Sequence, residues 1–262
     1  MWPFIKYYSI LDSGILDGAT DWHCHILPGV DDGIRTTEEA IAVLAYYEHL
    51  GLREVWLTPH IMEDVPNDPA ALRTRFTELT EAYREWARTT EAPEHPVGTL
   101  TLHLAAENMI DTLFDRRFEA GNLLSLGGRA PIPGTDGEML LIETSYFNPP
   151  MAFEQTLTQI KLHGFHPLLA HPERYVYMGR RDYVRLKEAG VRFQLNLMSL
   201  VGMYGDLAAE KANQLLLDGL YDYAGSDLHR LSPWQRAIHD KALTKKALAA
   251  LQSLRVRMDA NR

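Results

Sequence analysis

Strand-like and helix-like patterns of apolar residues alternate along the chain. Short apolar runs bounded by Gly, Pro or polar residues favour strands, and apolar residues three and four apart favour helices. We expect seven strands, at residues 20–26, 53–60, 99–107, 138–145, 166–173, 191–199 and 220–229. Helices are expected at about 36–51, 68–88, 109–120, 151–163, 181–189 and 207–218, and a last one follows the seventh strand.

This alternation predicts a sheet of parallel strands covered by helices. The expected strands are too apolar for a sheet with one face in water. Consecutive βα units in one α/β domain favour a barrel, and a doubly wound open sheet is the alternative. In both folds ligands bind at the carboxyl ends of the strands, so candidate chemistry is sought there.

Composition narrows the class of protein. The chain has 262 residues and a formal net charge of −9, so a nucleic-acid partner is not expected. No apolar run reaches the ~18 residues that span a bilayer, so we do not expect an integral membrane protein. The N-terminal residues do not resemble a signal peptide, and a single Cys excludes an intramolecular disulfide framework. The expected location is the cytoplasm.

Six of the expected strands carry a histidine or a carboxylate at or near their carboxyl end. The sixth strand offers Asn196 instead. In chain order the six strands contribute His23 and His25, His60, Glu107, Glu143, His171, and Asp227 with His229. Because the carboxyl ends of parallel strands meet at one edge, we expect these side chains to converge.

The spacing of these residues suits metal binding. In a strand, residues i and i+2 point to the same face, so His23 and His25 can reach one ion while Cys24 points away. Asp227 and His229 have the same spacing. Imidazole nitrogens with carboxylate oxygens favour Zn, Mn or Fe over Ca or Mg. So many ligands suggest more than one ion, and a carboxylate such as Glu107 can bridge two.

Each motif alone also has a plain structural explanation. An HxH or DxH pair in a strand is often incidental, and Asp31, Asp32 and Gly33 form a good turn without any metal. Taken together, however, so many unpaired polar groups at one barrel mouth would be costly without a cation or a hydrogen-bond partner.

Cys24 invites a second hypothesis, that of a cysteine-dependent phosphatase. Such an enzyme needs an Arg and a phosphate-cradling loop after the Cys, and the residues that follow are HILPGVD, without an Arg. We therefore expect Cys24 to be a packed, inert thiol.

The quoted motifs resemble the polymerase-and-histidinol-phosphatase (PHP) superfamily of metal-dependent phosphoesterases. The motifs are HCH, TPH ending at His60, AAE ending at Glu107, and SDLH at 226–229. Within it, DWHCHILPGVDDG, LLIETS and AHPERY are similar to the bacterial protein-tyrosine phosphatases that act on tyrosine autokinases of capsule and exopolysaccharide synthesis. The match spans about residues 20–240.

The resemblance implies a single-domain, distorted (β/α)7 barrel at 19–262, preceded by an N-terminal extension at 1–18. It also implies three divalent ions, with Mn, Fe and Zn as candidates. The implied ligands are His23, His25, Glu107 and Asp227 for one ion, Glu107, Glu143 and His171 for a second, and Asp32, His60 and His229 for a third.

Arg174, three residues after His171, is the candidate phosphate-binding residue. Its planar fork can bind a phosphate or stabilise charge in the transition state. The structural alternative is a salt bridge with Glu173 or another carboxylate. The resemblance favours the functional role.

The predicted function is that of a metal-dependent protein-tyrosine phosphatase, in which a metal-activated water attacks the phosphorus. The expected substrate is a phosphotyrosine in the flexible tail of a bacterial tyrosine kinase. Two alternatives remain: another PHP phosphomonoesterase, such as one acting on histidinol phosphate, and a catalytically silent metal-binding regulatory module.

Overall fold

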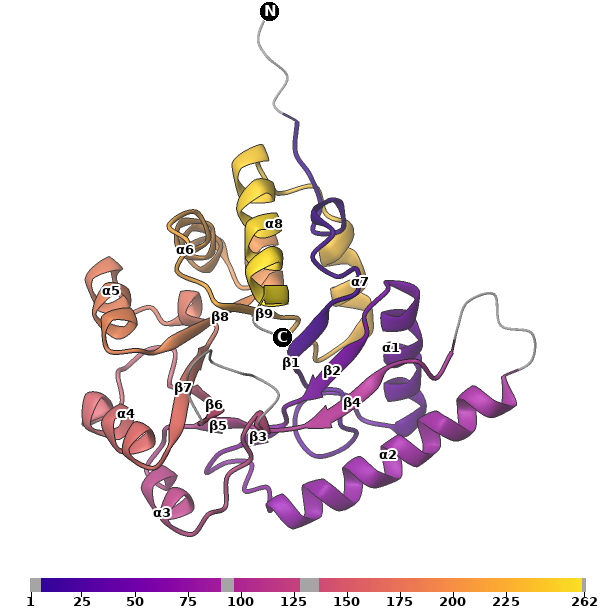
Figure 1. Cartoon of the computed structure of the whole chain (residues 1–262), viewed down its shortest axis with the longest axis horizontal. Coiled ribbons are helices and arrows are strands. Elements are labelled where there is room, and N and C mark those ends of the chain that lie inside the picture. The colour runs from indigo at the N-terminus through magenta and orange to yellow at the C-terminus, as the bar shows by residue number, and fades with distance from the viewer. Residues whose placement is uncertain (1–5, 91–96, 128–136, 261–262) are drawn as a thin grey trace, which may run out of the picture.

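The computed structural model describes residues 6–90, 97–127 and 137–260. Figure 1 shows the strands in the centre of the molecule with helices around them. The described strands are β1 (Thr20–Cys24), β2 (Glu54–Leu57), β3 (His60–Ile61), β4 (Thr101–Leu104), β5 (Glu107–Met109), β6 (Glu138–Glu143), β7 (Phe165–Ala170), β8 (Arg192–Asn196) and β9 (Tyr223–Gly225).

The α-helices lie between and after these strands. They are α1 (Thr37–His49), α2 (Pro69–Thr89), α3 (Phe114–Glu119), α4 (Phe153–Leu162), α5 (Arg180–Glu188), α6 (Asp206–Leu217), α7 (Leu231–His239) and α8 (Lys245–Ala260). Short 3-10 helices within the described ranges are η1 (Leu11–Ser13), η3 (Pro172–Arg174) and η4 (Leu197–Val201). The single helix expected after the last strand is thus two helices, α7 and α8.

Strand pairing confirms the predicted α/β class with parallel strands. The paired strands form two sheets, ordered β1-β2-β4 and β3-β5-β6-β7-β8-β9, and each neighbouring pair of these described strands is parallel. A single closed seven-stranded sheet is not found among the described residues. However, the backbone joins β1 to the segment after β9, since Asp227 N donates to His23 O at 2.8 Å and His25 N to Leu228 O at 3.0 Å.

The two sheets arise because two of the predicted strands are interrupted. The strand expected at 53–60 becomes β2 and β3, with Pro59 between them. Pro59 has no N–H to donate to a sheet ladder. The strand expected at 99–107 becomes β4 and β5, and between them Ala106 N donates to Leu124 O at 3.3 Å. Both interruptions place a site residue, His60 or Glu107, at the start of the following strand.

Local capping fixes where α1 and α2 begin. Thr36 accepts a hydrogen bond from Glu39 N at 3.2 Å, which starts α1 as the sequence predicts. Asp68 accepts from Ala71 N at 3.0 Å before Pro69, the first residue of α2. These caps fix where the loops before the helices end, and the first of these loops carries Asp32.

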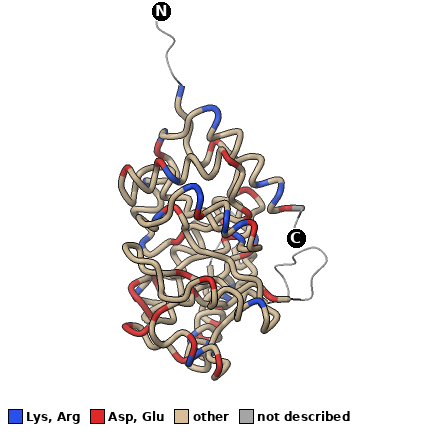
Figure 2. The backbone as a smooth tube through the Cα atoms, turned by 90° about the vertical axis from the view of Figure 1, so that its left-hand side faces the viewer, with Lys and Arg blue, Asp and Glu red and all other residues tan. Residues whose placement is uncertain are grey.

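The apolar strands and the inner helix faces form one core. Ile10 and Ile15, from the predicted N-terminal extension, are buried in it, and Tyr8 pairs with Leu243 as an antiparallel bridge. Residues 1–5 of that extension lie outside the described residues. Acidic and basic residues are interspersed along the outside of the chain (Figure 2). Among the described helices, none is long and apolar enough to cross a membrane.

Candidate metal centre

The predicted site residues gather at a cavity of about 460 Å³ beside the strand ends. Its lining includes Asp32, His60, Glu107, Arg174, Asp227 and His229. The remaining predicted ligands, His23, His25, Glu143 and His171, are buried and in polar contact with residues of that lining. The structure therefore brings all nine predicted metal ligands and Arg174 together.

The candidate ligands form three overlapping groups, and within each group the ligand atoms lie within 4.8 Å of one another. The groups are His23, His25, Glu107 and Asp227; His60, Glu107 and Glu143; and His25, Asp32, His60 and His229. The first matches the set implied by the sequence resemblance. In the second group His60 stands where His171 was expected, and in the third group His25 joins the three expected residues.

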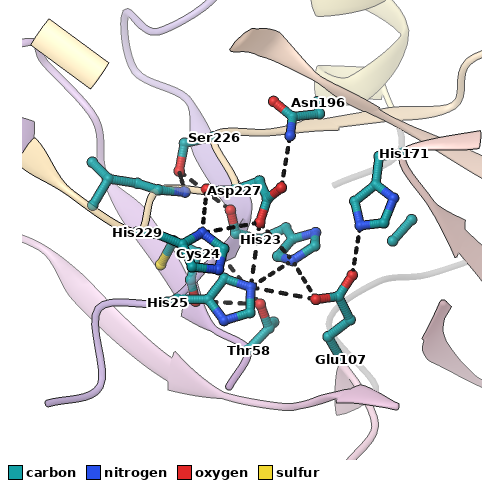
Figure 3. A network of polar contacts seen from close by, with 12 residues as sticks. His23, Cys24, His25, Thr58, Glu107, His171, Asn196, Ser226, Asp227 and His229 are labelled. Atoms are coloured by element: carbon teal, nitrogen blue, oxygen red, sulfur yellow. Dashed lines mark hydrogen bonds and ion pairs between the residues drawn. The ribbon is translucent and has the colours of Figure 1, made fainter. Parts of the chain in front are cut away.

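Glu107 contacts histidines through both of its carboxylate oxygens (Figure 3). Its Oε2 atom lies 3.2 Å from His23 Nε2, 3.3 Å from His25 Nε2 and 3.2 Å from His60 Nδ1. Its other oxygen, Oε1, lies 2.8 Å from His171 Nε2. The carboxylate is fully buried and has imidazoles on both oxygens, so it is suited to bridging ions.

The strand-alternation argument applies only in part. His23 lies in β1, but β1 ends at Cys24, before His25. Asp227 follows β9 and has a left-handed backbone with φ of 49°, so Asp227 and His229 are not an i, i+2 pair of one strand. His171 is also left-handed, with φ of 32°. Such backbones are costly for non-glycine residues and occur preferentially at functional sites.

Several buried polar atoms of the site make no hydrogen bond. They are His60 Nδ1, Glu107 Oε2, Glu143 Oε1 and His171 Nδ1. Three of these atoms lie close together without hydrogen-bond geometry, with His60 Nδ1 3.2 Å from Glu107 Oε2 and 2.9 Å from Glu143 Oε1. Buried polar groups are normally hydrogen-bonded, so nitrogen and oxygen atoms that crowd together in this way indicate a cation that they share. Imidazole nitrogens and carboxylate oxygens are the donors that Zn, Mn and Fe accept, so the residues fit a divalent-metal centre.

The charges in the cluster favour bound cations. Burial raises the pKa of Glu107, but the charges of His23 and His60 outweigh it and hold that pKa well below its usual range. Burial and the neighbouring His25 lower the pKa of His60, but Glu107 and Glu143 raise it more, to about 9. The two carboxylates therefore favour the positively charged form of His60, and a bound cation would take the place of that charge.

Two residues that were not predicted as ligands orient the histidines. Asp31 Oδ2 lies 2.8 Å from His25 Nδ1 and accepts from His60 N at 3.1 Å. Gln194 Oε1 lies 2.7 Å from His23 Nδ1. Acceptors on the far nitrogen of a metal-binding histidine fix its tautomer and orientation. Asp31 was visible in the sequence as the neighbour of Asp32, whereas Gln194 in β8 gave no local signal.

Asp227 presents one oxygen to the histidines and the other to a polar group of residues. Its Oδ1 atom lies 3.3 Å from His25 Nε2. Its Oδ2 atom accepts from Arg174 Nη1 at 2.9 Å and from Asn196 Nδ2 at 2.7 Å. The salt bridge considered for Arg174 therefore exists, and its partner is Asp227. Glu173 instead accepts from Asn196 N and from Tyr221.

Arg174 is held between two tyrosine rings. Its guanidinium carbon lies 4.3 Å from the centre of the Tyr146 ring and 4.0 Å from that of Tyr204. The two rings come from loops after β6 and η4. Nothing in a linear pattern shows that these two loops enclose one arginine.

Arg230 ties the Asp32 loop to the last strand end. Its Nη1 atom donates to Asp32 O and to His229 O, both at 2.7 Å, and also to Gly33 O. The Asp32 carboxylate itself is mostly exposed, with Oδ1 3.3 Å from His229 Nε2. Arg230 thus holds in place the exposed Asp32 and the half-buried His229.

Cys24 is buried away from the cavity. Its Sγ atom lies 3.3 Å from Trp56 O, and burial raises the pKa of the thiol well above its usual value. A thiolate nucleophile needs a lowered pKa and access to substrate, and Cys24 has neither. The prediction of a packed thiol is confirmed, and its inertness stays a prediction.

Known proteins share this sequence pattern and fold. The family described as "Capsular polysaccharide synthesis, CpsB/CapC" matches residues 19–248. The tyrosine-protein phosphatase YwqE of Bacillus subtilis (strain 168) is 27% identical over 235 residues, covering 88% of this chain and 83% of that protein. CapC of Staphylococcus aureus is 23% identical over 220 residues, covering 81% of this chain and 77% of that protein.

A solved structure agrees with these relatives. It comes from the crystal structures of YwqE from Bacillus subtilis and CpsB from Streptococcus pneumoniae, described as unique metal-dependent tyrosine phosphatases. Its TM-score with this chain is 0.73 at 26% identity, and the match covers 92% of this chain and 91% of that one. The likeness therefore extends over nearly the whole fold.

Proposed function

Because this chain belongs to the CpsB/CapC family, within the PHP superfamily, we propose that it is a metal-dependent protein-tyrosine phosphatase. The observation that carries the proposal is the cluster of buried imidazole and carboxylate atoms beside Arg174, several of which make no hydrogen bond. A relative and a solved structure with the same fold are named as tyrosine phosphatases.

We assign three divalent ions, of Mn, Fe or Zn, to the cluster. His23, His25, Glu107 and Asp227 would hold the first. Glu107, Glu143 and His171 would hold the second, since His171 Nε2 lies 2.8 Å from Glu107 Oε1 and 3.9 Å from Glu143 Oε2. Asp32, His60 and His229 would hold the third. Support comes from the overlap of the three ligand groups at Glu107, His25 and His60. His60 Nδ1 lies 2.9 Å from Glu143 Oε1, so its second nitrogen adjoins the second set.

Bound divalent ions supply positive charge to phosphate oxygens and lower the pKa of a coordinated water. The chain's own residues bind and orient the substrate. Arg174 donates N–H groups to the phosphate and offsets charge on its oxygens, and the two tyrosine rings restrict where the guanidinium can lie. The cavity of about 460 Å³ is large enough for a phosphotyrosine side chain.

The proposed substrate is a phosphotyrosine in the flexible tail of a bacterial tyrosine kinase that regulates capsule or exopolysaccharide synthesis. The family description supports the pathway, and the open cavity suits a flexible segment. The proposed location is the cytoplasm, where ATP-dependent kinases act. We further infer that the two sheets make one distorted (β/α)7 barrel at 19–262, with the backbone bonds between β1 and the segment after β9 as support.

The test is anaerobic purification with metal quantification, followed by hydrolysis of a phosphotyrosine peptide, p-nitrophenyl phosphate and histidinol phosphate. We expect bound metal, preference for the peptide, and loss of both metal and activity in His171→Ala and Asp227→Ala. Full activity in the metal-free protein would refute the metal mechanism. Preference for histidinol phosphate would refute the substrate, and no hydrolysis with Mn, Fe, Co or Zn would indicate a silent regulatory module.

A further inference from the structure

A second, smaller cavity lies directly beside the catalytic one. Its volume is about 230 Å³, and Tyr146, Arg174 and Tyr204 line both cavities. The same arginine and its two tyrosine rings therefore form the wall between the two cavities. A peptide whose phosphotyrosine occupies the first cavity has its neighbouring residues next to the second.

Apolar side chains from three elements face this second cavity. Phe147 follows β6, Val176 follows η3, and Leu207 lies in the first turn of α6. They are 71%, 47% and 51% exposed. Single exposed apolar residues need no explanation, but three that meet at one cavity next to a catalytic site indicate a binding surface.

The walls of the cavity are fixed by hydrogen bonds. Val176 N donates to Tyr146 O at 2.8 Å, which joins the loops after β6 and β7. Lys211, in α6, donates its Nζ to Tyr175 O at 2.7 Å and to Met178 O at 2.8 Å. The cavity is therefore largely preformed, and little ordering is needed when it is filled.

The chemistry of the lining selects an apolar occupant. Arg174 is paired with Asp227, and the Glu173 carboxylate accepts from Tyr221 Oη at 2.8 Å and from Asn196 N. In the proposed complex Arg174 is engaged by both Asp227 and the phosphate, so a charged side chain entering here would lose water without gaining an unengaged partner. The volume is below the range of about 300–1,000 Å³ typical of pockets for whole small molecules, so one side chain fits better than a separate ligand.

We propose that this second cavity binds a large apolar side chain, of the size of Leu, Met or Phe, within two residues of the phosphotyrosine in the substrate. The proposal rests on the proposed function and adds sequence selectivity to it. Phe147 and Leu207 are specificity-determining residues, since they touch the neighbouring side chain and not the phosphate.

The experiment compares phosphotyrosine peptides of equal charge that carry Leu or Ser at each of the two positions on either side of the phosphotyrosine. Hydrolysis of p-nitrophenyl phosphate, which has no neighbouring residue, is measured in parallel with the metal-loaded protein. We expect kcat/KM to be about tenfold higher for the best Leu peptide than for its Ser counterpart. In Phe147→Ser and Leu207→Ser this ratio falls to about 1–2, while turnover of p-nitrophenyl phosphate is unchanged.

Leu217→Ser is the matched control, because Leu217 lies in the same helix, is 49% exposed and lines neither cavity. It should keep the wild-type ratio. Equal turnover of all peptides by wild type, with normal turnover of p-nitrophenyl phosphate, overturns the proposal and leaves the phosphatase function standing. A preference for the Leu peptide that survives in Leu207→Ser also overturns the proposal. The same holds if the wild-type protein is a dimer that Leu207→Ser dissociates while all peptides are hydrolysed equally, because Leu207 then serves a dimer interface. Absence of all hydrolysis refutes the proposed function instead.

Discussion

The Asp31 carboxylate accepts from Gly33 N at 2.9 Å through Oδ1 and lies 2.8 Å from His25 Nδ1 through Oδ2. The residue thus ties a metal-facing imidazole to the loop that carries Asp32. A Cβ at position 33 would lie 2.2 Å from His25 O, so the loop can pass this close to His25 only because residue 33 is glycine. Asp31 is therefore a positioning residue, although it lies one position before the expected ligand.

Replacing Asp31 with Asn should weaken metal binding by about 10–100-fold, because an amide cannot match the carboxylate in orienting His25. The measurement is a metal titration followed by activity, with kcat restored at high metal concentration. Asp32→Asn is the comparison, since it changes a proposed ligand directly. Equal metal affinity in wild type and Asp31→Asn would contradict the role.

Tyr204→Ala should lower kcat/KM for p-nitrophenyl phosphate by about tenfold, because it removes one of the two rings that hold Arg174. Tyr204→Phe keeps the ring and loses only a weak contact of 3.4 Å from Tyr204 Oη to Asp227 Oδ2, so it should stay close to wild type. Metal content should be the same in all three proteins. A loss in Tyr204→Phe as large as in Tyr204→Ala would show that the hydroxyl matters and the ring does not.

Removing the metal should lower thermal stability, since the buried carboxylates and imidazoles then lose their shared cations. Ligand at about 1,000 times its Kd adds about 4 kcal/mol to the free energy of unfolding. Melting curves with chelator and with added Mn should therefore differ by several degrees. In Asp227→Asn the difference should shrink, because one ligand of the first set is weakened. The same melting temperature with and without metal in wild type would argue against a structural centre.

Cys24→Ala should leave kcat/KM unchanged within about twofold, because the thiol is buried against Trp56 O and its pKa is raised by burial. A small loss of stability, about 1 kcal/mol, is expected from the lost packing. Alkylating reagents should not inactivate the native protein. Loss of activity in a folded, metal-loaded Cys24→Ala would restore the cysteine mechanism.

The sequence was informative wherever local chemistry decides the structure. The Thr36 cap, the alternation of strands and helices, and the polar residues at strand ends all depend on neighbours in the chain, so patterns display them. The split of the strand expected at 53–60 was not predicted, although Pro59 lacks the N–H that a sheet ladder needs. What the pattern could not show is the pairing that ends β4 and turns Ala106 N toward Leu124.

The site was predictable in its members but not in its support. His23 and His25 were expected to converge with Glu107, because strand ends meet in any parallel α/β fold. Gln194 is an ordinary inward residue of β8 until the fold sets it 2.7 Å from His23. The left-handed backbone of Asp227 is likewise imposed by tertiary contacts, including its N–H bond to His23 O.

The two oxygens of Asp227 link metal and substrate thermodynamically. Oδ1 faces the imidazoles, and Oδ2 accepts a hydrogen bond from Arg174, which is proposed to bind the phosphate. A phosphate that draws Arg174 toward itself leaves more negative charge on Asp227, which strengthens its hold on a cation. Such coupling is reciprocal, so the factor by which metal tightens phosphate binding equals the factor by which phosphate tightens metal binding. In the proposed centre this single carboxylate would make the metal-free protein bind phosphate more weakly and the phosphate-bound protein hold its ions more tightly.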